Sequence, residues 1–179
     1  MAASNFDACL KLVFVNEGGF SDDIRDPGRA TQFGVTQATL SAWRGHPVTP
    51  AEVQRLTQAE AAQIYRANYW TPVRGDDLPA GVDLAVMDYA VNSGTRTAIR
   101  ALQKVVGAEP DGALGPMTLS AVKRGDPATV IRGLSRRRLS MLASLRSWAV
   151  FGRGWQARVA RTEGAALAMA HAGEGRAAA

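Results

Sequence analysis

Residues 6–36 read FDACLKLVFVNEGGFSDDIRDPGRATQFGVT, and this stretch decides the fold class. Its apolar side chains recur every three or four residues as far as Glu17, so they share one face of a predicted helix. The pair Gly18-Gly19 ends that helix, because glycine adopts the left-handed geometry of a helix C-terminus without strain. The turn formers and the brief extended run that follow predict a short β/turn segment near residues 20–35.

Helix signals return after this segment and continue to the end of the chain. Thr36, Thr49 and Thr57 each precede a helical pattern and can act as N-caps, the second with Pro50 and Glu52 behind it. Further helices are predicted over 79–92, 95–106, 116–123, 127–148 and 155–171. We find no long linker and no clean internal repeat. The sequence therefore predicts a mainly α fold.

Length and composition exclude several classes of protein. The 179 residues suit one domain of ordinary size, and 46% apolar with 21% charged residues is normal for a folded protein. No apolar run is long enough to span a bilayer, and the N-terminus lacks the basic and apolar regions of a Sec-type signal peptide. A single cysteine, Cys9, excludes an internal disulfide, and His46 and His171 lack the spacing of a zinc motif. We expect no metal and no cofactor.

Charge is distributed unevenly along the chain. Residues 1–95 carry 7 Lys/Arg against 11 Asp/Glu, a net of −4, whereas residues 96–179 carry 14 against 5, a net of +9. Such a basic half could bind nucleic acid, anionic lipid or the acidic polymers of a bacterial envelope, and charge alone does not choose among them. The run Arg136-Arg137-Arg138 points to different helix faces and lacks interleaved aromatics, so a solvated face or envelope contact is favoured over specific nucleic-acid binding.

Glu17 is the strongest candidate for catalysis. It closes a helix on its apolar face, where a carboxyl group is partly removed from water and its protonated form is favoured. The negative end of the helix dipole acts in the same direction. A carboxylic acid that keeps its proton near neutral pH can serve as general acid in glycosidic cleavage. The alternative is an ordinary helix-end glutamate that faces solvent or pairs with an arginine.

An ordered motif begins at Glu17. The chain has Glu17-Gly-Gly-Phe and then Asp26-Pro-Gly-Arg-Ala-Thr-Gln-Phe-Gly-Val-Thr. It resembles the opening of the glycoside hydrolase family 108 peptidoglycan hydrolases (N-acetylmuramidases), which include phage-type endolysins. Arg29 stands where that family has a second glycine, so either the loop differs in shape or the arginine faces the substrate. The resemblance covers about residues 5–160 and implies a lysozyme-like helical fold.

The resemblance also implies roles for three residues. Glu17 would protonate the leaving glycosidic oxygen, Asp26 would stabilise the oxocarbenium-like transition state or activate water, and Thr31 would position that water. The offset from Glu17 to Asp26 equals that of phage lysozymes, whereas Thr31 comes one residue earlier than there. Asp26 is otherwise a turn former, and Thr31 a strand hydroxyl bonded to backbone. Asp22 and Asp23 are alternative second carboxylates.

Substrate contacts are predicted for side chains that can stack on sugar rings or hydrogen-bond their substituents. These are Phe20, Arg29, Phe33, Tyr69, Trp70 and Asn92. Tyr69 and Trp70 form either a cleft wall or a helix end, and Asn92 either binds an N-acetyl group or caps its helix.

The second half of the chain carries its own resemblance. Segments within 82–118 look like the predicted peptidoglycan-binding region attached to this hydrolase family, although Asp111-Gly-Ala-Leu-Gly-Pro-Met-Thr118 also reads as a tight turn before a helix. The implied division is a lysozyme-like catalytic region over 1–78, a peptidoglycan-binding-like region over 79–172 in the same globular unit, and a flexible tail over 173–179.

Together these features predict a soluble, monomeric lysozyme that cleaves the β-1,4 bond between N-acetylmuramic acid and N-acetylglucosamine. Peptidoglycan is the expected partner, with anionic envelope polymers contacting the basic half. Without a Sec-type signal, the enzyme is expected to be made in the cytoplasm and to reach the wall in the periplasm through a holin or another export route. The alternatives are a non-catalytic wall-binding or secretion-associated protein on the same fold and, third, a nucleic-acid-binding protein.

Overall fold

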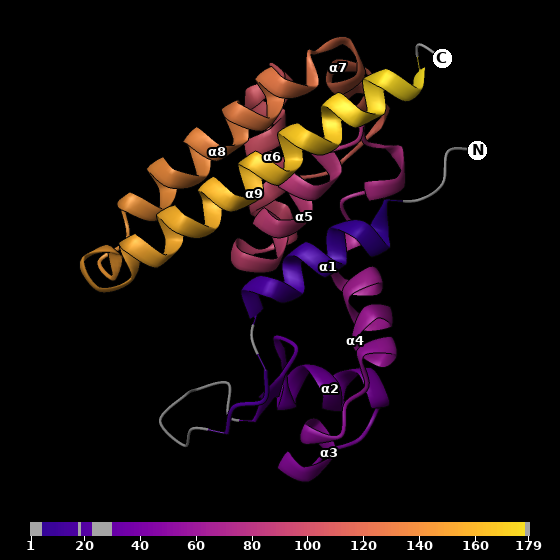
Figure 1. Cartoon of the computed structure of the whole chain (residues 1–179), viewed down its shortest axis with the longest axis vertical. Coiled ribbons are helices and arrows are strands. Elements are labelled where there is room, and N and C mark those ends of the chain that lie inside the picture. The colour runs from indigo at the N-terminus through magenta and orange to yellow at the C-terminus, as the bar shows by residue number, and fades with distance from the viewer. Residues whose placement is uncertain (1–4, 18, 23–29, 178–179) are drawn as a thin grey trace. The chain divides into compact units, whose positions relative to one another are not determined.

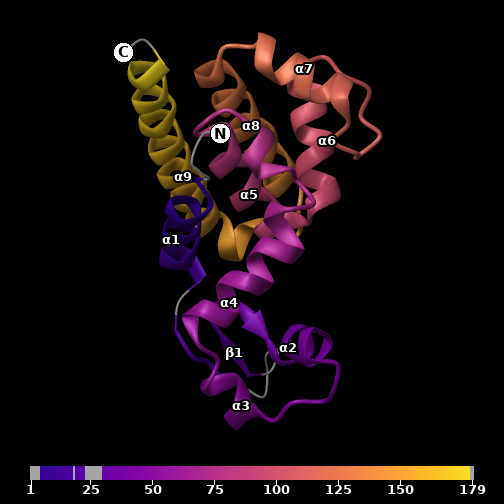
Figure 2. The same ribbon diagram turned by 90° about the vertical axis from the view of Figure 1, so that its right-hand side faces the viewer.

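The computed structural model describes the backbone of residues 5–17, 19–22 and 30–177, and this part of the chain is mainly helical (Figures 1 and 2). Its elements, in chain order, are α1 (Phe6–Glu17), β1 (Thr31–Gln32), β2 (Val35–Thr36), α2 (Gln37–Arg44), α3 (Pro50–Gln54), α4 (Gln58–Tyr65), a π-helix (Arg66–Trp70), a 3₁₀ turn (Gly75–Asp77), α5 (Val82–Ser93), α6 (Thr95–Val105), α7 (Pro116–Arg124), α8 (Pro127–Ala143) and α9 (Trp148–Ala177). The predicted mainly α, lysozyme-like class is confirmed, as is the short β/turn segment.

The chain divides into two compact units. The smaller unit is Leu10–Asn68, and the larger unit combines Met1–Cys9 with Tyr69–Ala179. The division falls inside α1 and then inside the π-helix. The functional division into residues 1–78 and 79–172 concerns what each part binds, and it stays a prediction.

In the smaller unit, local capping signals set where the helices begin. The Thr36 hydroxyl accepts a hydrogen bond from the backbone N–H of Thr39 and caps α2. Thr49 and Glu52 form a complete capping box at the start of α3, with Pro50 in the first turn. These caps satisfy N–H groups that a helix start would leave unpaired, and they confirm the predicted starts.

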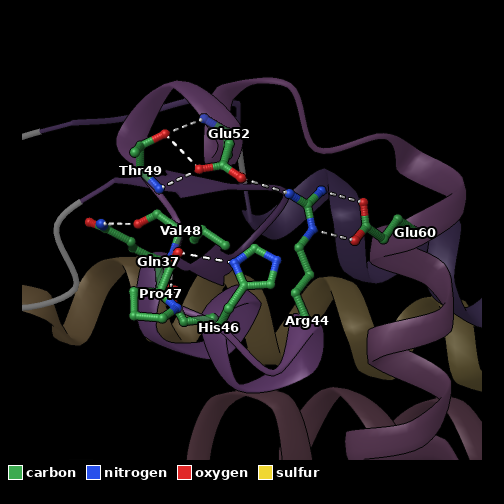
Figure 3. A network of polar contacts seen from close by, with 9 residues as sticks. Gln37, Arg44, His46, Pro47, Val48, Thr49, Glu52 and Glu60 are labelled. Carbon is green, nitrogen blue, oxygen red and sulfur yellow. Dashed lines mark hydrogen bonds and ion pairs between the residues drawn. The ribbon is translucent and has the colours of Figure 1, made fainter.

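A polar network ties the three short helices of the smaller unit together (Figure 3). The Arg44 guanidinium on α2 donates to both carboxylate oxygens of Glu60 on α4, at 2.9 and 2.8 Å, and lies 3.6 Å from Glu52 on α3. The hydrogen bond from Arg44 holds the pKa of Glu60 below its usual range. Gln37 adds a hydrogen bond of 2.6 Å to the carbonyl of Val48. The scaffold beside the β1–β2 hairpin is thus held by side chains from all three helices.

The larger unit is built around α5. Every side chain from Val82 to Ala90 is buried, so this helix is enclosed on all sides. It packs against α6, α8 and α9, and α8 and α9 run alongside each other as an antiparallel hairpin (Figure 1). A helix buried all round needs partners for any polar group it carries.

Asp88 is such a polar group, and three side chains from the helical hairpin satisfy it. Arg138 donates to its carboxylate at 2.6 Å, Arg158 at 2.8 Å and the Thr162 hydroxyl at 3.0 Å. Burial raises the pKa of Asp88, but the charges and hydrogen bonds of the two arginines outweigh it and hold the pKa below its ordinary value. This cluster joins α5 to both α8 and α9.

The arginine run of α8 is therefore not one exposed patch. Arg136 and Arg137 are exposed, whereas Arg138 is 3% exposed and belongs to the core. The expectation that all three arginines face solvent or envelope polymers is wrong for Arg138. The helical repeat turns the Arg138 side chain towards α5, where it forms an ion pair with Asp88.

The last two helices differ from their predicted bounds. The first ends at Ala143 instead of near residue 148, and the second begins at Trp148 and continues past His171 to Ala177. The glycines in this segment cost about 1 kcal/mol each in helix propensity, and packing of α9 along α8 overrides them. Helix covers most of the segment over 173–179 that was expected to be a flexible tail.

The turn before α7 uses its polar groups internally. The Gln103 amide, 1% exposed, donates to the Asp111 carboxylate at 2.7 Å, to the Ala113 carbonyl at 3.0 Å and to the Thr118 hydroxyl at 3.2 Å. Its oxygen accepts from the Gly112 N–H at 2.9 Å. The Asp-Gly-x-x-Gly-x-x-Thr motif thus shapes a loop between α6 and α7, which fits the structural alternative.

Candidate active site

Glu17 ends α1 on its apolar side, as predicted. Val13 and Leu10, one and two turns before it, are buried, and Glu17 is half-buried with its Oε1 atom shielded from solvent. A methyl group at Gly34 would lie 2.9 Å from Glu17 Oε2 and 3.0 Å from its Cγ. The side chain of Glu17 therefore lies directly against the backbone of the β1–β2 turn.

That turn has an uncommon backbone. Its two central residues both have positive φ, 51° at Phe33 and 73° at Gly34, and the flanking pair is Gln32 with Val35. Two positive φ values in a two-residue hairpin define a type I′ turn. Glycine adopts this geometry freely, whereas a bulky residue such as Phe33 holds it at a cost of about 1–2 kcal/mol. The segment predicted as one extended run is thus a hairpin with a strained tip.

Three aromatic rings hold the strained turn. The Tyr65 hydroxyl, at the end of α4, donates to the Phe33 carbonyl at 3.0 Å. Phe14 of α1 packs edge-on against Tyr65, with ring centroids 5.2 Å apart, and at a tilt against Phe33 at 5.6 Å. The turn under Glu17 is therefore fixed from two helices, one of which carries Glu17 itself.

Thr31 sits in the middle of a small set of extended segments. It pairs with Thr36 of β2, and its backbone exchanges hydrogen bonds of 2.8 and 2.9 Å with Ser21. Just before and after Ser21, Phe20 is 39% exposed and Asp22 is exposed. The structure thus brings Thr31 into the hairpin on which Glu17 lies, with Phe20 available at its edge.

Two predicted site residues, Asp26 and Arg29, lie outside the described residues. The alternative carboxylate Asp23 does so as well. Their assignments remain predictions from the motif.

The other predicted substrate contacts belong to the larger unit. Tyr69 is half-buried and Asn92 is exposed in the last turn of α5. Trp70 is 1% exposed, and its ring packs edge-on against Phe6 at 5.4 Å and directly over Gly75. A ring enclosed in this way has no free face for a sugar, so Trp70 is a core residue in this structure.

Sequence reasoning missed the residues that support Glu17. Phe14, Gly34 and Tyr65 were not among the predicted site residues. The signal for Gly34 was partly present, because a glycine at the second position of a two-residue loop is typical of a type I′ hairpin. No signal linked Tyr65 to this turn, since the contact spans 32 residues of chain.

The arrangement can supply acid chemistry. A shielded carboxyl group rests on a rigid turn, so its direction is fixed before substrate binds. Within the described part of the chain, no three His, Cys, Asp or Glu side chains are grouped to hold a metal ion.

Comparison with known proteins gives the chain its family. The family model described as glycosyl hydrolase 108 matches residues 10–94, which include Glu17 and the whole hairpin. None of the curated proteins compared with the chain matches it. The solved structure of SagA from Brucella abortus is 48% identical, with a TM-score of 0.85, over 93% of this chain and 95% of that one. The chain therefore belongs to the glycosyl hydrolase 108 family.

Proposed function

We propose that this protein is a lysozyme of the N-acetylmuramidase type, with Glu17 as its general acid. Its family suggests a peptidoglycan hydrolase. The observation that carries the finer proposal is the placement of Glu17, whose shielded carboxyl group is braced against the Phe33-Gly34 turn. The bond cleaved is the β-1,4 linkage between N-acetylmuramic acid and N-acetylglucosamine.

The proposed chemistry needs an acid and a second group. Glu17 donates its proton to the glycosidic oxygen as the bond to the leaving sugar breaks, so that the leaving group departs as an alcohol. Asp26 stabilises the positive charge that develops on the remaining sugar or activates the attacking water, and Thr31 orients that water.

Substrate contacts are proposed for residues that follow Glu17 closely in the chain and for residues between 69 and 92. Phe20 has an exposed ring that can stack on a sugar, and Phe33 carries its ring on the turn below Glu17. Arg29, Tyr69 and Asn92 are proposed to hydrogen-bond or pair with substituents of the glycan. Residues 79–172 are proposed to add affinity for peptidoglycan.

The enzyme would act on the cell wall. No helix among the described residues is both long and apolar enough to cross a membrane. We propose that the protein reaches the wall through a holin or another export route, as an endolysin or as a wall remodeller that serves secretion. Anionic envelope polymers would contact its basic half, and we propose that it acts as a monomer.

Replacing Glu17 with glutamine tests the proposal. The change keeps size and helix propensity but removes the transferable proton, so release of new reducing ends from purified walls should fall by orders of magnitude. Glu109→Gln, at an exposed position, is the matched control and should retain full activity. Analysis of the products should find the new reducing end on N-acetylmuramic acid.

Three results would contradict all or part of this proposal. Near wild-type lysis by Glu17→Gln would remove Glu17 from the acid role. Wall binding by the wild type without any release of reducing ends would favour the non-catalytic wall-binding or secretion-associated alternative. A new reducing end on N-acetylglucosamine would still indicate a glycosidase, but the bond cleaved would differ from the one proposed.

A further inference from the structure

Residues 144–156, which comprise the turn between α8 and α9 and the first turns of α9, expose an unusual concentration of apolar side chains; this segment is called the α8–α9 turn below. Val150 is 75% exposed, Phe151 55% and Leu145 41%. These three lie within seven positions of one another, although the larger unit already buries a full core around α5. In Figure 1 this turn forms one end of the helical hairpin, and α7 lies at the other end. Clustered exposed apolar residues mark an interaction surface more often than scattered ones do.

Two tryptophans extend this cluster along α9. The Trp155 ring lies 6.2 Å from Trp148 and 5.8 Å from Phe151, centroid to centroid. A methyl group at Gly152 would lie 2.8 Å from the Trp148 ring, so that ring rests flat on the helix backbone. The rings are therefore held by the helix in fixed positions, each partly open to solvent.

A shallow hollow adjoins the rings and is lined in part by the guanidinium-bearing side chain of Arg153. Its volume is about 260 Å³, and it is lined by Trp148, Ala149, Val150, Gly152, Arg153 and Gln156. Arg153 and Gln156 are exposed and offer N–H donors beside apolar walls. Such a site suits an anionic group attached to apolar chains, because arginine binds phosphate through its planar fork of donors.

The charge around the turn has one sign. Between residues 127 and 162 the sequence contains eight arginines and no aspartate or glutamate. Two of the arginines, Arg146 and Arg153, flank the exposed apolar residues and are themselves exposed. Arginine beside tryptophan, phenylalanine and aliphatic side chains is the composition of segments that rest in the interface of an anionic bilayer.

We propose that the α8–α9 turn is a docking surface for an anionic phospholipid membrane. Val150, Phe151 and Leu145 enter the boundary between headgroups and acyl chains, Trp148 and Trp155 lie at headgroup level, and Arg146 and Arg153 contact lipid phosphates. A glycan would use the ring faces and the polar edge of the hollow, but it would leave Val150 and Leu145 without a role. The lipid surface accounts for the aliphatic residues, the rings and the charge together.

The docking surface is distinct from the proposed catalytic residues and does not depend on hydrolysis. A membrane-bound enzyme would be kept at the inner boundary of the wall, where its substrate is within reach. The Glu17→Gln variant should therefore bind vesicles as the wild type does. Loss of hydrolysis and loss of docking are thus separate outcomes.

The test is co-sedimentation of the full chain with vesicles of equal parts phosphatidylcholine and phosphatidylglycerol, against vesicles of phosphatidylcholine alone. Binding should require the anionic lipid and weaken with salt. The variant Val150→Ser/Phe151→Ser should bind about 10-fold more weakly, since it removes the apolar insertion. Val15→Ser is the matched control, because Val15 of α1 has the same exposure, 76%, as Val150, 75%.

A charge-matched pair separates a specific surface from general attraction. Arg146→Gln/Arg153→Gln should weaken binding about 25-fold, from roughly fivefold per arginine near an anionic surface. Arg136→Gln/Arg137→Gln removes the same charge from exposed positions of α8 outside the turn and should have a much smaller effect. Thermal unfolding would verify that each variant is folded.

Three results would overturn the proposal. Vesicle binding could be absent, or it could fall equally in both charge-matched variants, which would leave only non-specific attraction. The Val150→Ser/Phe151→Ser variant could instead bind vesicles normally and lose adsorption to lipid-free peptidoglycan, which would assign the turn to the glycan.

Discussion

Replacing Gly34 with alanine tests whether the hairpin turn positions Glu17. Alanine adds one methyl group at a residue with φ +73°, and that group would meet the Tyr65 hydroxyl and approach Glu17 Oε2 to 2.9 Å. Gly45, the C-cap of α2, supplies a matched control in the same unit. Its φ is +76°, and a methyl group there would have no neighbour within 4 Å.

The free energies of unfolding of Gly34→Ala and Gly45→Ala should differ only by the steric crowding of the added methyl group. Alanine in the left-handed region costs about 1–2 kcal/mol at either position. At Gly34 the crowding of Tyr65 and Glu17 adds about 1–3 kcal/mol, the usual cost of overpacking. The free energy of unfolding should therefore fall by about 2–5 kcal/mol in Gly34→Ala and by about 1–2 kcal/mol in Gly45→Ala. A displacement of Glu17 by about 1 Å should also lower the rate of hydrolysis about 100-fold.

Urea unfolding and release of reducing ends from purified walls measure the two effects. The double variant Gly34→Ala/Tyr65→Phe, which removes the hydroxyl that the new methyl group meets, should be less destabilised than the sum of its single changes. Equal stability and equal activity of Gly34→Ala and Gly45→Ala would refute the reasoning, since the close approach of Glu17 to the turn would then be without consequence.

The larger unit gives three further predictions. Asp88→Asn leaves Arg138 buried without its counter-charge and should lower the free energy of unfolding by about 3–5 kcal/mol, measured in urea. Because folding lowers the pKa of Asp88, the Asp88 carboxylate stabilises the folded state above its unfolded pKa of about 4, and this stabilisation is lost as the pH falls through the lower folded pKa. In that acid range the free energy of unfolding should therefore fall more steeply with pH in the wild type than in Asp88→Asn. Urea unfolding at successive pH values would measure this difference. Arg136→Glu/Arg137→Glu should weaken salt-sensitive adsorption to intact walls and leave cleavage of a small soluble glycan unchanged. An equal loss of adsorption and cleavage would place these arginines at the substrate. Arg138→Glu should instead unfold the protein, as circular dichroism would detect.

Local signals predicted the beginnings of helices well. Thr36 and Thr49 cap their helices as their sequence contexts indicate, because a cap joins residues only three positions apart. The end of α1 at Glu17 was likewise predicted, and with it the strongest candidate for catalysis. The start of α9 was not, because its packing along α8 outweighs the weak helix propensity of Gly152 and Gly154, and α8 ends at Ala143, earlier than predicted.

Burial of individual large side chains could not be read from the sequence. Trp43 of α2 is 41% exposed, whereas Trp70, a predicted sugar contact, is 1% exposed. The same holds for three adjacent arginines, of which only Arg138 is buried. Each outcome depends on what a distant segment places opposite the side chain.

The sequence by itself determined the mainly helical class, the capped helix starts at Thr36 and Thr49, the uneven charge and the motif that singles out Glu17, because each of these depends on neighbouring residues. Only the tertiary structure decided that Glu17 rests on a strained turn held by Tyr65 and Phe14, and that Asp88 draws Arg138 inside. These contacts join residues 32 and 50 positions apart in the chain, for Tyr65 with Phe33 and for Arg138 with Asp88. Such pairings form only when the helices pack, since bringing distant residues together costs chain entropy that local sequence preferences cannot supply.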